Sequence, residues 1–70
     1  MDNHMLISNI KNVIHEKGYI QSAVAKRAGL NPKTFSNMLN GRANIKAIDV
    51  PNIANALGVT PNDLFNTDAS

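Results

Sequence analysis

Residues 21–40, QSAVAKRAGLNPKTFSNMLN, carry the clearest structural pattern in the chain. Val24 and Ala28 recur at helical spacing, and the polar residues between them occupy the other side, so a helix is predicted over residues 21–28. Gly29 follows directly, and glycine adopts the left-handed conformation of a helix-ending turn at little steric cost. The pattern therefore predicts a short helix that is closed by a sharp turn.

A second helix is predicted over residues 32–40. Asn31 is a favoured cap and Pro32 suits the first helical position. The apolar side chains of this helix recur at spacings of three and four, and they are Phe35, Met38 and Leu39. The opposite face carries Pro32, Lys33, Ser36, Asn37 and Asn40. A polar outer face on the second of two helices joined by a tight turn is typical of a helix-turn-helix, whose second helix enters the DNA major groove.

Three further helices are predicted around this pair, over residues 5–17, from a cap at Asp49 to Leu57, and over Pro61–Phe65. No segment alternates between apolar and polar residues over the length of a strand, so the predicted fold class is all-α, a compact five-helix domain. Residues 1–66 are predicted to form this single domain, and residues 67–70 a disordered tail.

The start of the last helix carries a specific signal. Thr60 is a favoured cap, Pro61 suits the first helical position, and Asp63 lies three residues after Thr60. A hydroxyl and an acid at this spacing can each accept a hydrogen bond from the other's backbone amide, so a capping box is predicted.

Composition limits the kinds of function. The chain has 70 residues, enough for one small domain, and no cysteine, which excludes disulfides and thiolate metal sites. His4 and His15 do not have the spacing of metal ligands, and no nucleophile–base pair or glycine-rich phosphate loop is present. The sequence therefore predicts neither an enzyme nor a metal or other cofactor. No apolar run approaches the ~20 residues that span a bilayer, and no signal peptide is recognisable, so a cytoplasmic location is expected.

Positive charge is concentrated in the middle of the chain. The net charge is +2, yet all seven basic residues lie between Lys11 and Lys46, where Glu16 is the one acid, so this segment carries +6. The flanks carry four aspartates, or −4. A basic centre suits a polyanionic partner, although a solvated surface with chance clustering would give the same pattern.

Four pieces of the sequence, in their order and spacing, resemble the lambda-repressor-like helix-turn-helix family, also called the XRE family. They are EKGYIQ at 16–21, AVAKRAGL at 23–30, TFSNMLNG at 34–41 and IANALGVTPNDLF at 53–65. The resemblance covers about residues 6–65. It implies a five-helix domain that binds double-stranded DNA, with the helix at residues 32–40 in the major groove.

The resemblance also implies which side chains contact DNA. The positions that would read bases are Pro32, Lys33 and Asn37, with Thr34 and Ser36 as secondary contacts. A lysine can donate to guanine O6 and N7, and an asparagine can pair with adenine N6 and N7. The positions that match phosphate contacts are Gln21, Asn31, Asn40 and Arg42, with Asn44 and Lys46 in the loop beyond.

Three residues depart from the family's pattern. Ile20 stands where a Thr or Ser cap is frequent, so Gln21 or Ser22 would have to satisfy the first amides, or Ile20 would pack and the helix start would shift. Pro32 has no hydrogen-bonding side chain and offers only apolar contact, for example to a thymine methyl group. Leu39 replaces a residue that is more often charged, and is expected either to deepen the core or to face a partner.

We interpret this as the sequence of a sequence-specific DNA-binding protein, a transcriptional repressor or small regulator of phage or plasmid type. A homodimer is expected through the region of the last helix, around Val59, Leu64 and Phe65. The alternative is a five-helix protein-interaction module, for example antitoxin-like, with little or no DNA binding, which Pro32 and Leu39 favour. An RNA-binding module is disfavoured because the basic face carries no aromatic residue.

Overall fold

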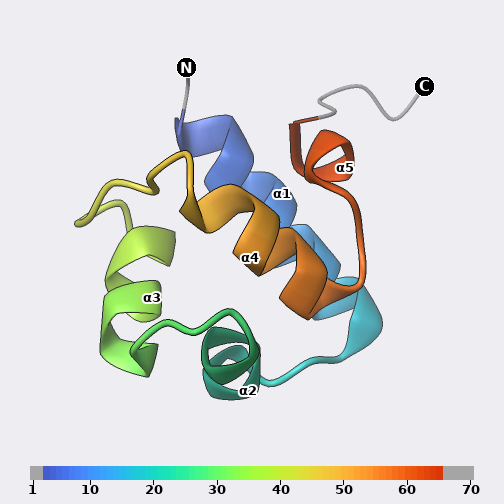
Figure 1. Cartoon of the computed structure of the whole chain (residues 1–70), viewed down its shortest axis with the longest axis horizontal. Coiled ribbons are helices and arrows are strands. Elements are labelled where there is room, and N and C mark those ends of the chain that lie inside the picture. Colours follow the sequence, from blue (N-terminus) through green and yellow to red (C-terminus); the bar gives the residue numbers. More distant parts are fainter. Residues whose placement is uncertain (1–2, 66–70) are drawn as a thin grey trace.

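Five helices make up the part of the chain that the computed structural model describes, residues 3–65, and no strand occurs within it (Figure 1). They are α1 (Asn3–Lys17), α2 (Gln21–Arg27), α3 (Pro32–Leu39), α4 (Asp49–Leu57) and α5 (Pro61–Phe65). The predicted all-α, five-helix fold class is confirmed. The predicted tail at residues 67–70 lies outside the described residues.

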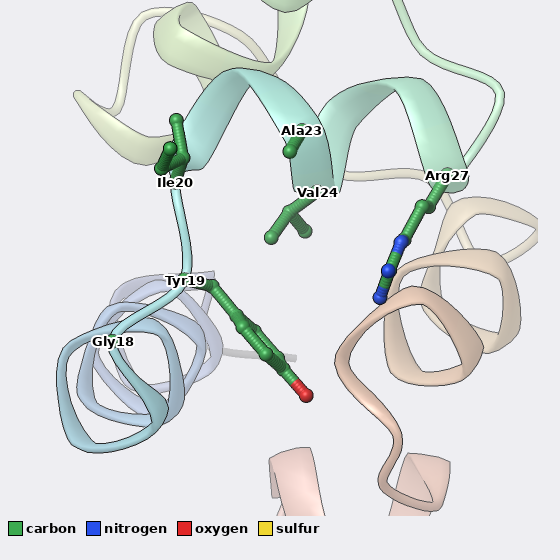
Figure 2. Close-up of a pocket in the computed structure, with 6 residues that line it drawn as sticks. All are labelled: Gly18, Tyr19, Ile20, Ala23, Val24 and Arg27. Atoms are coloured by element: carbon green, nitrogen blue, oxygen red, sulfur yellow. The ribbon is translucent and has the colours of Figure 1, made fainter.

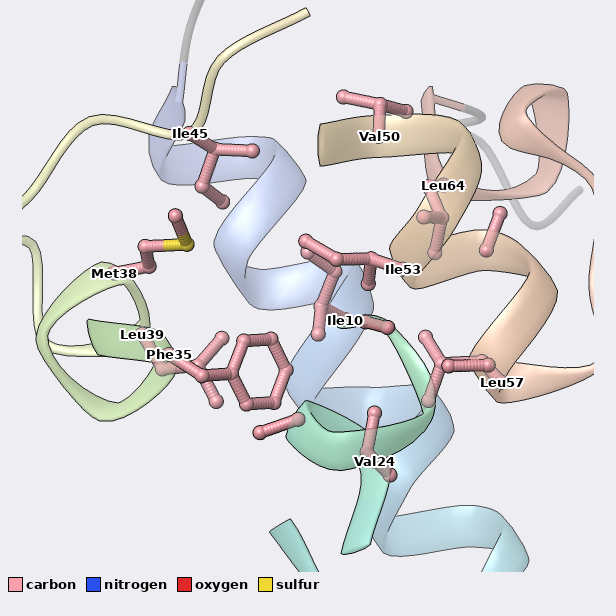
Figure 3. Close-up of a cluster of buried hydrophobic side chains, with 14 of the residues drawn as sticks. Ile10, Val24, Phe35, Met38, Leu39, Ile45, Val50, Ile53, Leu57 and Leu64 are labelled. Atoms are coloured by element: carbon pink, nitrogen blue, oxygen red, sulfur yellow. The ribbon is translucent and has the colours of Figure 1, made fainter. Parts of the chain in front are cut away.

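The apolar faces of all five helices meet in one core. α2 packs against α3 and α4, α1 packs against α3 and α5, and α4 packs against α5. Phe35 of α3 is fully buried and points toward Ile10 of α1 and Val24 of α2 (Figure 3). Burying such a side chain contributes roughly 1.5–3 kcal/mol relative to leaving it in water. No polar or charged residue among those described is buried, so apolar burial alone fills this core.

The turn between α2 and α3 depends on Gly29, which has a φ of +75°. The Gly29 amide donates to the Lys26 carbonyl at 3.1 Å, and the Leu30 amide donates to the Ala25 carbonyl at 2.9 Å. These two bonds satisfy carbonyls that the end of α2 leaves without helical partners. Leu30 is thereby brought back to the edge of the core. The predicted sharp turn at Gly29 is confirmed.

Lys17 ties the end of α1 to the end of α4. Its Nζ donates to the Leu57 carbonyl at 3.1 Å and lies 5.8 Å from the centroid of the Tyr19 ring. Leu57 is the last residue of α4, so the cation meets the negative end of that helix. This lysine therefore has a structural role between two helices.

Several predicted helix boundaries are wrong by one or two residues. α1 begins at Asn3 rather than at residue 5, α2 ends at Arg27 rather than 28, and α3 ends at Leu39 rather than 40. Ala28 and Asn40 are C-caps, whose amides still donate to carbonyls of the preceding turn. The helical hydrogen bonding therefore continues for one residue beyond each helix before the glycine reverses the chain.

The prediction that Asp49 caps α4 is also wrong. Asp49 is the first helical residue, and Ile48 occupies the cap position. The amides of Asp49 and Val50 already donate to the Lys46 and Ala47 carbonyls, at 2.9 and 3.3 Å, so a turn precedes the helix and moves its start. The Asp49 carboxylate accepts a hydrogen bond from the Lys46 amide at 3.1 Å and so closes that turn.

The predicted capping box at the start of α5 is confirmed. The Thr60 amide donates to Oδ2 of Asp63 at 3.0 Å, and the Asp63 amide donates to Oγ1 of Thr60 at 3.3 Å. Hydrogen bonding to Thr60, first through its backbone and then through its side chain, lowers the pKa of the Asp63 carboxyl, and the nearby Lys17 lowers it further. The ionised form of Asp63 is therefore the one that the fold favours.

Because the pKa of Asp63 is lower in the folded than in the unfolded chain, its contribution to stability is present above the unfolded pKa and is lost as the pH falls. We expect the free energy of unfolding to decrease on acidification below about pH 4, the region in which free aspartates titrate. Asp63→Asn removes the titrating group, and should make this decrease shallower in urea unfolding measured from pH 7 to pH 2. Equal acid sensitivity of the two proteins would contradict this role.

Candidate nucleic-acid interface

The start of α3 is fixed by its own cap. Asn31 is extended, with φ −64° and ψ 132°, and its Oδ1 accepts a hydrogen bond from the Lys33 amide at 2.8 Å. Pro32 takes the first helical position, where its missing amide leaves no unmet hydrogen bond. The predicted cap is confirmed, and Pro32, Lys33 and Thr34 follow it as exposed residues.

The two faces of α3 differ sharply in their environment. The inner face is buried in the core and consists of Phe35, Met38 and Leu39. On the outer side, Ser36 and Asn37 are half-buried, one turn after the exposed first residues of the helix. The side chain of Asn37 makes no hydrogen bond within residues 3–65, so its amide is available to a partner.

The end of α3 positions the loop that follows it. Gly41 has a φ of +78°, and its amide donates to the Met38 carbonyl at 3.2 Å. The amides of Arg42 and Ala43 both donate to the Asn37 carbonyl, at 2.8 and 3.2 Å. The backbone of Arg42 is thus bound to the same residue whose side chain lies on the outer side of α3.

The loop beyond α3 is anchored by one apolar residue. Ile45 is buried, whereas Asn44 and Lys46 on either side of it are exposed. Burial of Ile45 therefore presents its two polar neighbours at the surface beside α3. Asn40, the C-cap of α3, is exposed as well.

The start of α2 has no side-chain cap. Ile20 occupies the cap position in an extended conformation, with φ −93° and ψ 127°, and is 70% exposed. α2 begins at Gln21, as predicted, so the helix start does not shift and neither Gln21 nor Ser22 caps it. Gln21 is exposed, and its side chain makes no hydrogen bond within the described chain.

Lys11 of α1 is the residue that the sequence did not indicate as part of this region. It lines a shallow hollow of about 410 Å³ together with Gln21, and an adjoining hollow of about 390 Å³ together with Asn40 and Gly41. Leu39 lines both hollows. Lys11 therefore lies between the start of α2 and the end of α3. Its position depends on how α1 packs against α3, which no local sequence pattern reveals.

Most of the central positive charge is free to meet a partner. Lys17 is held by the Leu57 carbonyl, but the side chains of the other six basic residues form no hydrogen bond or ion pair within residues 3–65. They are Lys11, Lys26, Arg27, Lys33, Arg42 and Lys46. Both His4 and His15 are exposed.

Within residues 3–65, no group of three or more His, Asp or Glu side chains could hold a metal ion. No helix in that part of the chain is long and apolar enough to cross a membrane.

Two short helices joined by a tight turn, with the outer side of the second helix polar and the region around it basic, define a helix-turn-helix DNA-binding domain. Residues 9–70 match the family of Cro/C1-type HTH DNA-binding domains, and the chain belongs to this family of DNA-binding regulators. No curated protein and no solved structure matches the chain. The resemblance inferred from the sequence is confirmed.

Two of the residues singled out in the sequence are now placed in the core. Leu39 is 3% exposed, so it deepens the core and does not face a partner. Leu64, expected at a dimer surface, is fully buried, and its carbonyl accepts a hydrogen bond from Nδ2 of Asn9 at 2.6 Å. The expectation for Leu64 is wrong because α5 needs this side chain to cover α1 and α4. Val59 is half-buried and Phe65 is 38% exposed.

The cap of α3 gives a direct test of this geometry. Asn31→Ala removes the acceptor for the Lys33 amide and should destabilise the protein by about 1 kcal/mol in urea unfolding, the usual cost of losing a cap. Asn31→Asp keeps an acceptor at the same place and should retain most of the stability. Equal losses in the two variants would show that the Asn31 cap does not stabilise α3.

Proposed function

We propose that this protein binds double-stranded DNA sequence-specifically and regulates transcription, as a repressor or small regulator of phage or plasmid type. α3, together with Asn40, would lie in the major groove. The observation that carries the proposal is the division of α3 into two faces. Its three large apolar side chains are buried, so its remaining side chains are free for a groove.

Base reading rests mainly on Lys33 and Asn37. Both side chains lack an intramolecular partner within the described chain, and their lengths and donor groups suit guanine and adenine edges respectively. Pro32 would contribute apolar contact, while Thr34 and Ser36 would make secondary contacts to bases or phosphates. Each good contact from Lys33 or Asn37 would discriminate against a wrong base by roughly 1–3 kcal/mol.

Phosphate contacts would come from residues around α3. Gln21 stands at the start of α2, with Lys11 beside it. The other candidates are Asn31 at the cap of α3, Asn40 at its end, and Arg42, Asn44 and Lys46 in the loop beyond, all exposed. Lys11 lines hollows with both Gln21 and Asn40, so it links the start of α2 to the end of α3. Contacts to phosphates hold the protein in register on the duplex and carry no sequence information of their own.

We further propose that the protein acts in the cytoplasm and binds DNA as a homodimer. Two copies of a helix-turn-helix would then read half-sites about 34 Å apart, one turn of the duplex. Phe65 and Val59 remain candidates for the contact between copies, because each keeps part of its side chain exposed.

A protein-interaction module without DNA binding is the alternative. The exposed Pro32 favours it, because the first residue of α3 offers no polar group to a base. A salt titration separates the two functions. Affinity for random duplex DNA should fall steeply as salt rises, by about 0.9 logarithmic units per tenfold increase in salt for each phosphate neutralised. The absence of any salt-sensitive affinity at low ionic strength would leave the interaction module as the better explanation.

The assignment of base readers is tested by three alanine variants, once the preferred site has been selected from a pool of random duplexes. Lys33→Ala and Asn37→Ala should each relax preference at one base pair, by about 1–3 kcal/mol. Arg42→Ala should weaken selected and random duplexes alike and reduce the salt slope by about one unit. If all three variants lose the same affinity for selected and for random DNA, the readers are wrongly assigned.

A further inference from the structure

A third hollow opens on the side of α2 near the α1–α2 connection. It has a volume of about 240 Å³ and is lined by Gly18, Tyr19, Ile20, Ala23, Val24 and Arg27. Tyr19 and Arg27 stand on either side of the opening, with Val24 between them (Figure 2). None of the residues assigned to base or phosphate contact lines this hollow.

Ile20, which lines this hollow, is an unusual residue for its position at the start of α2. The side chain is 70% exposed and sits at the cap of α2, where a serine, threonine or aspartate would satisfy a free backbone amide. It gains neither burial nor a capping hydrogen bond, so the folded monomer gives no reason for an isoleucine here. Together with Ala23 and Val24, which also line the hollow, Ile20 gives it an apolar wall.

Arg27 supplies charge at the edge of the apolar surface. Its guanidinium forms no hydrogen bond or ion pair within residues 3–65, and no carboxylate lines the hollow. A guanidinium beside an apolar surface pairs well with a carboxylate, which it binds through two parallel hydrogen bonds. The hollow therefore favours an occupant that combines a bulky apolar group with an adjacent negative charge.

We propose that this hollow is a docking site for a partner protein, which inserts a bulky apolar side chain against Ile20, Ala23 and Val24 and places a neighbouring carboxylate on Arg27. The volume is below the roughly 300–1,000 Å³ of pockets that enclose small molecules, but suits one side chain of a larger surface. The occupant is thus an acidic, apolar segment of another protein.

A second copy of the chain fits this description less well. Its exposed large apolar residues with an aspartate nearby are Ile48, next to Asp49, and Phe65, near Asp63. Each of these carboxylates already accepts a backbone hydrogen bond through Oδ2, from the Lys46 amide to Asp49 and from the Thr60 amide to Asp63. A two-bond contact with Arg27 of another copy would therefore have to share that oxygen, whereas a carboxylate of another protein can offer both oxygens.

The test uses the isotope-labelled full chain and an end-blocked peptide, GSDFLDSG, followed by amide chemical-shift changes. Binding should saturate at millimolar peptide and shift amides of residues 18–27. The uncharged peptide GSNFLNSG lacks the carboxylates, and the apolar-depleted peptide GSDSSDSG lacks the bulky apolar side chains. Each should therefore bind at least about fivefold more weakly. No shifts at residues 18–27 with GSDFLDSG would overturn the proposal, as would equal binding of all three peptides.

Two variants and one control locate the site. Arg27→Gln and Ile20→Ser should each weaken GSDFLDSG by at least about fivefold, whereas Lys26→Gln, a neighbouring cation outside the hollow, should not. Ile20→Ser introduces a favoured cap, so an unchanged or higher thermal midpoint would show that its loss of binding is not unfolding. Equal weakening by Lys26→Gln would show that peptide binding depends only on the overall positive charge of α2, and would overturn the site.

Spectra of the protein without peptide test whether a second copy occupies the hollow. Concentration-dependent shifts at residues 18–27 without peptide would identify a second copy as the occupant and overturn the assignment to another protein. The peptide experiment contains no DNA, so a failure of the proposed DNA reading leaves its result intact.

Discussion

Burial of the apolar side of α3 is the constraint on which the rest of the molecule depends. α3 has only eight residues, too few to be stable as an isolated helix in water. Phe35, Met38 and Leu39 give it tertiary support, and α1 and α2 supply the surfaces that cover Phe35 (Figure 3). The outward polar side chains owe their fixed direction to this burial, because a helix that is held on one face must present the other.

Hydrogen bonds at the two ends of α3 add to the stabilisation that burial provides. Asn31 fixes the first turn by accepting from the Lys33 amide, and Gly41 turns the chain so that the Arg42 amide returns to the Asn37 carbonyl. Both ends are therefore closed without help from any other helix. The backbone that carries the candidate base and phosphate contacts is held as one short unit, which lowers the entropic cost of ordering it on DNA.

How much could be read from sequence alone depended on whether a feature is local. The apolar stripe of α3, the Asn31 cap and the turn at Gly29 follow from spacing and residue type, and all were predicted. The place of Lys11 between the two ends of the helix-turn-helix depends on how α1 packs, and was missed. Leu64 was misplaced for the related reason that a five-residue helix gives too little periodicity to separate its inner from its outer side.

The stability of α2 bears on both candidate surfaces. This helix has seven residues and no side-chain cap, so it relies on Val24 and Ala25 in the core and on the turn at Gly29. A polar cap at position 20 would stabilise it by about 1 kcal/mol. Ile20 is instead apolar and exposed, and it gives α2 no side-chain cap. Gln21, the next residue, is free on the side of Lys11, while Ile20 borders the hollow that contains Arg27. The start of α2 therefore separates a polar surface suited to phosphate from an apolar surface suited to protein, and one short helix supports both.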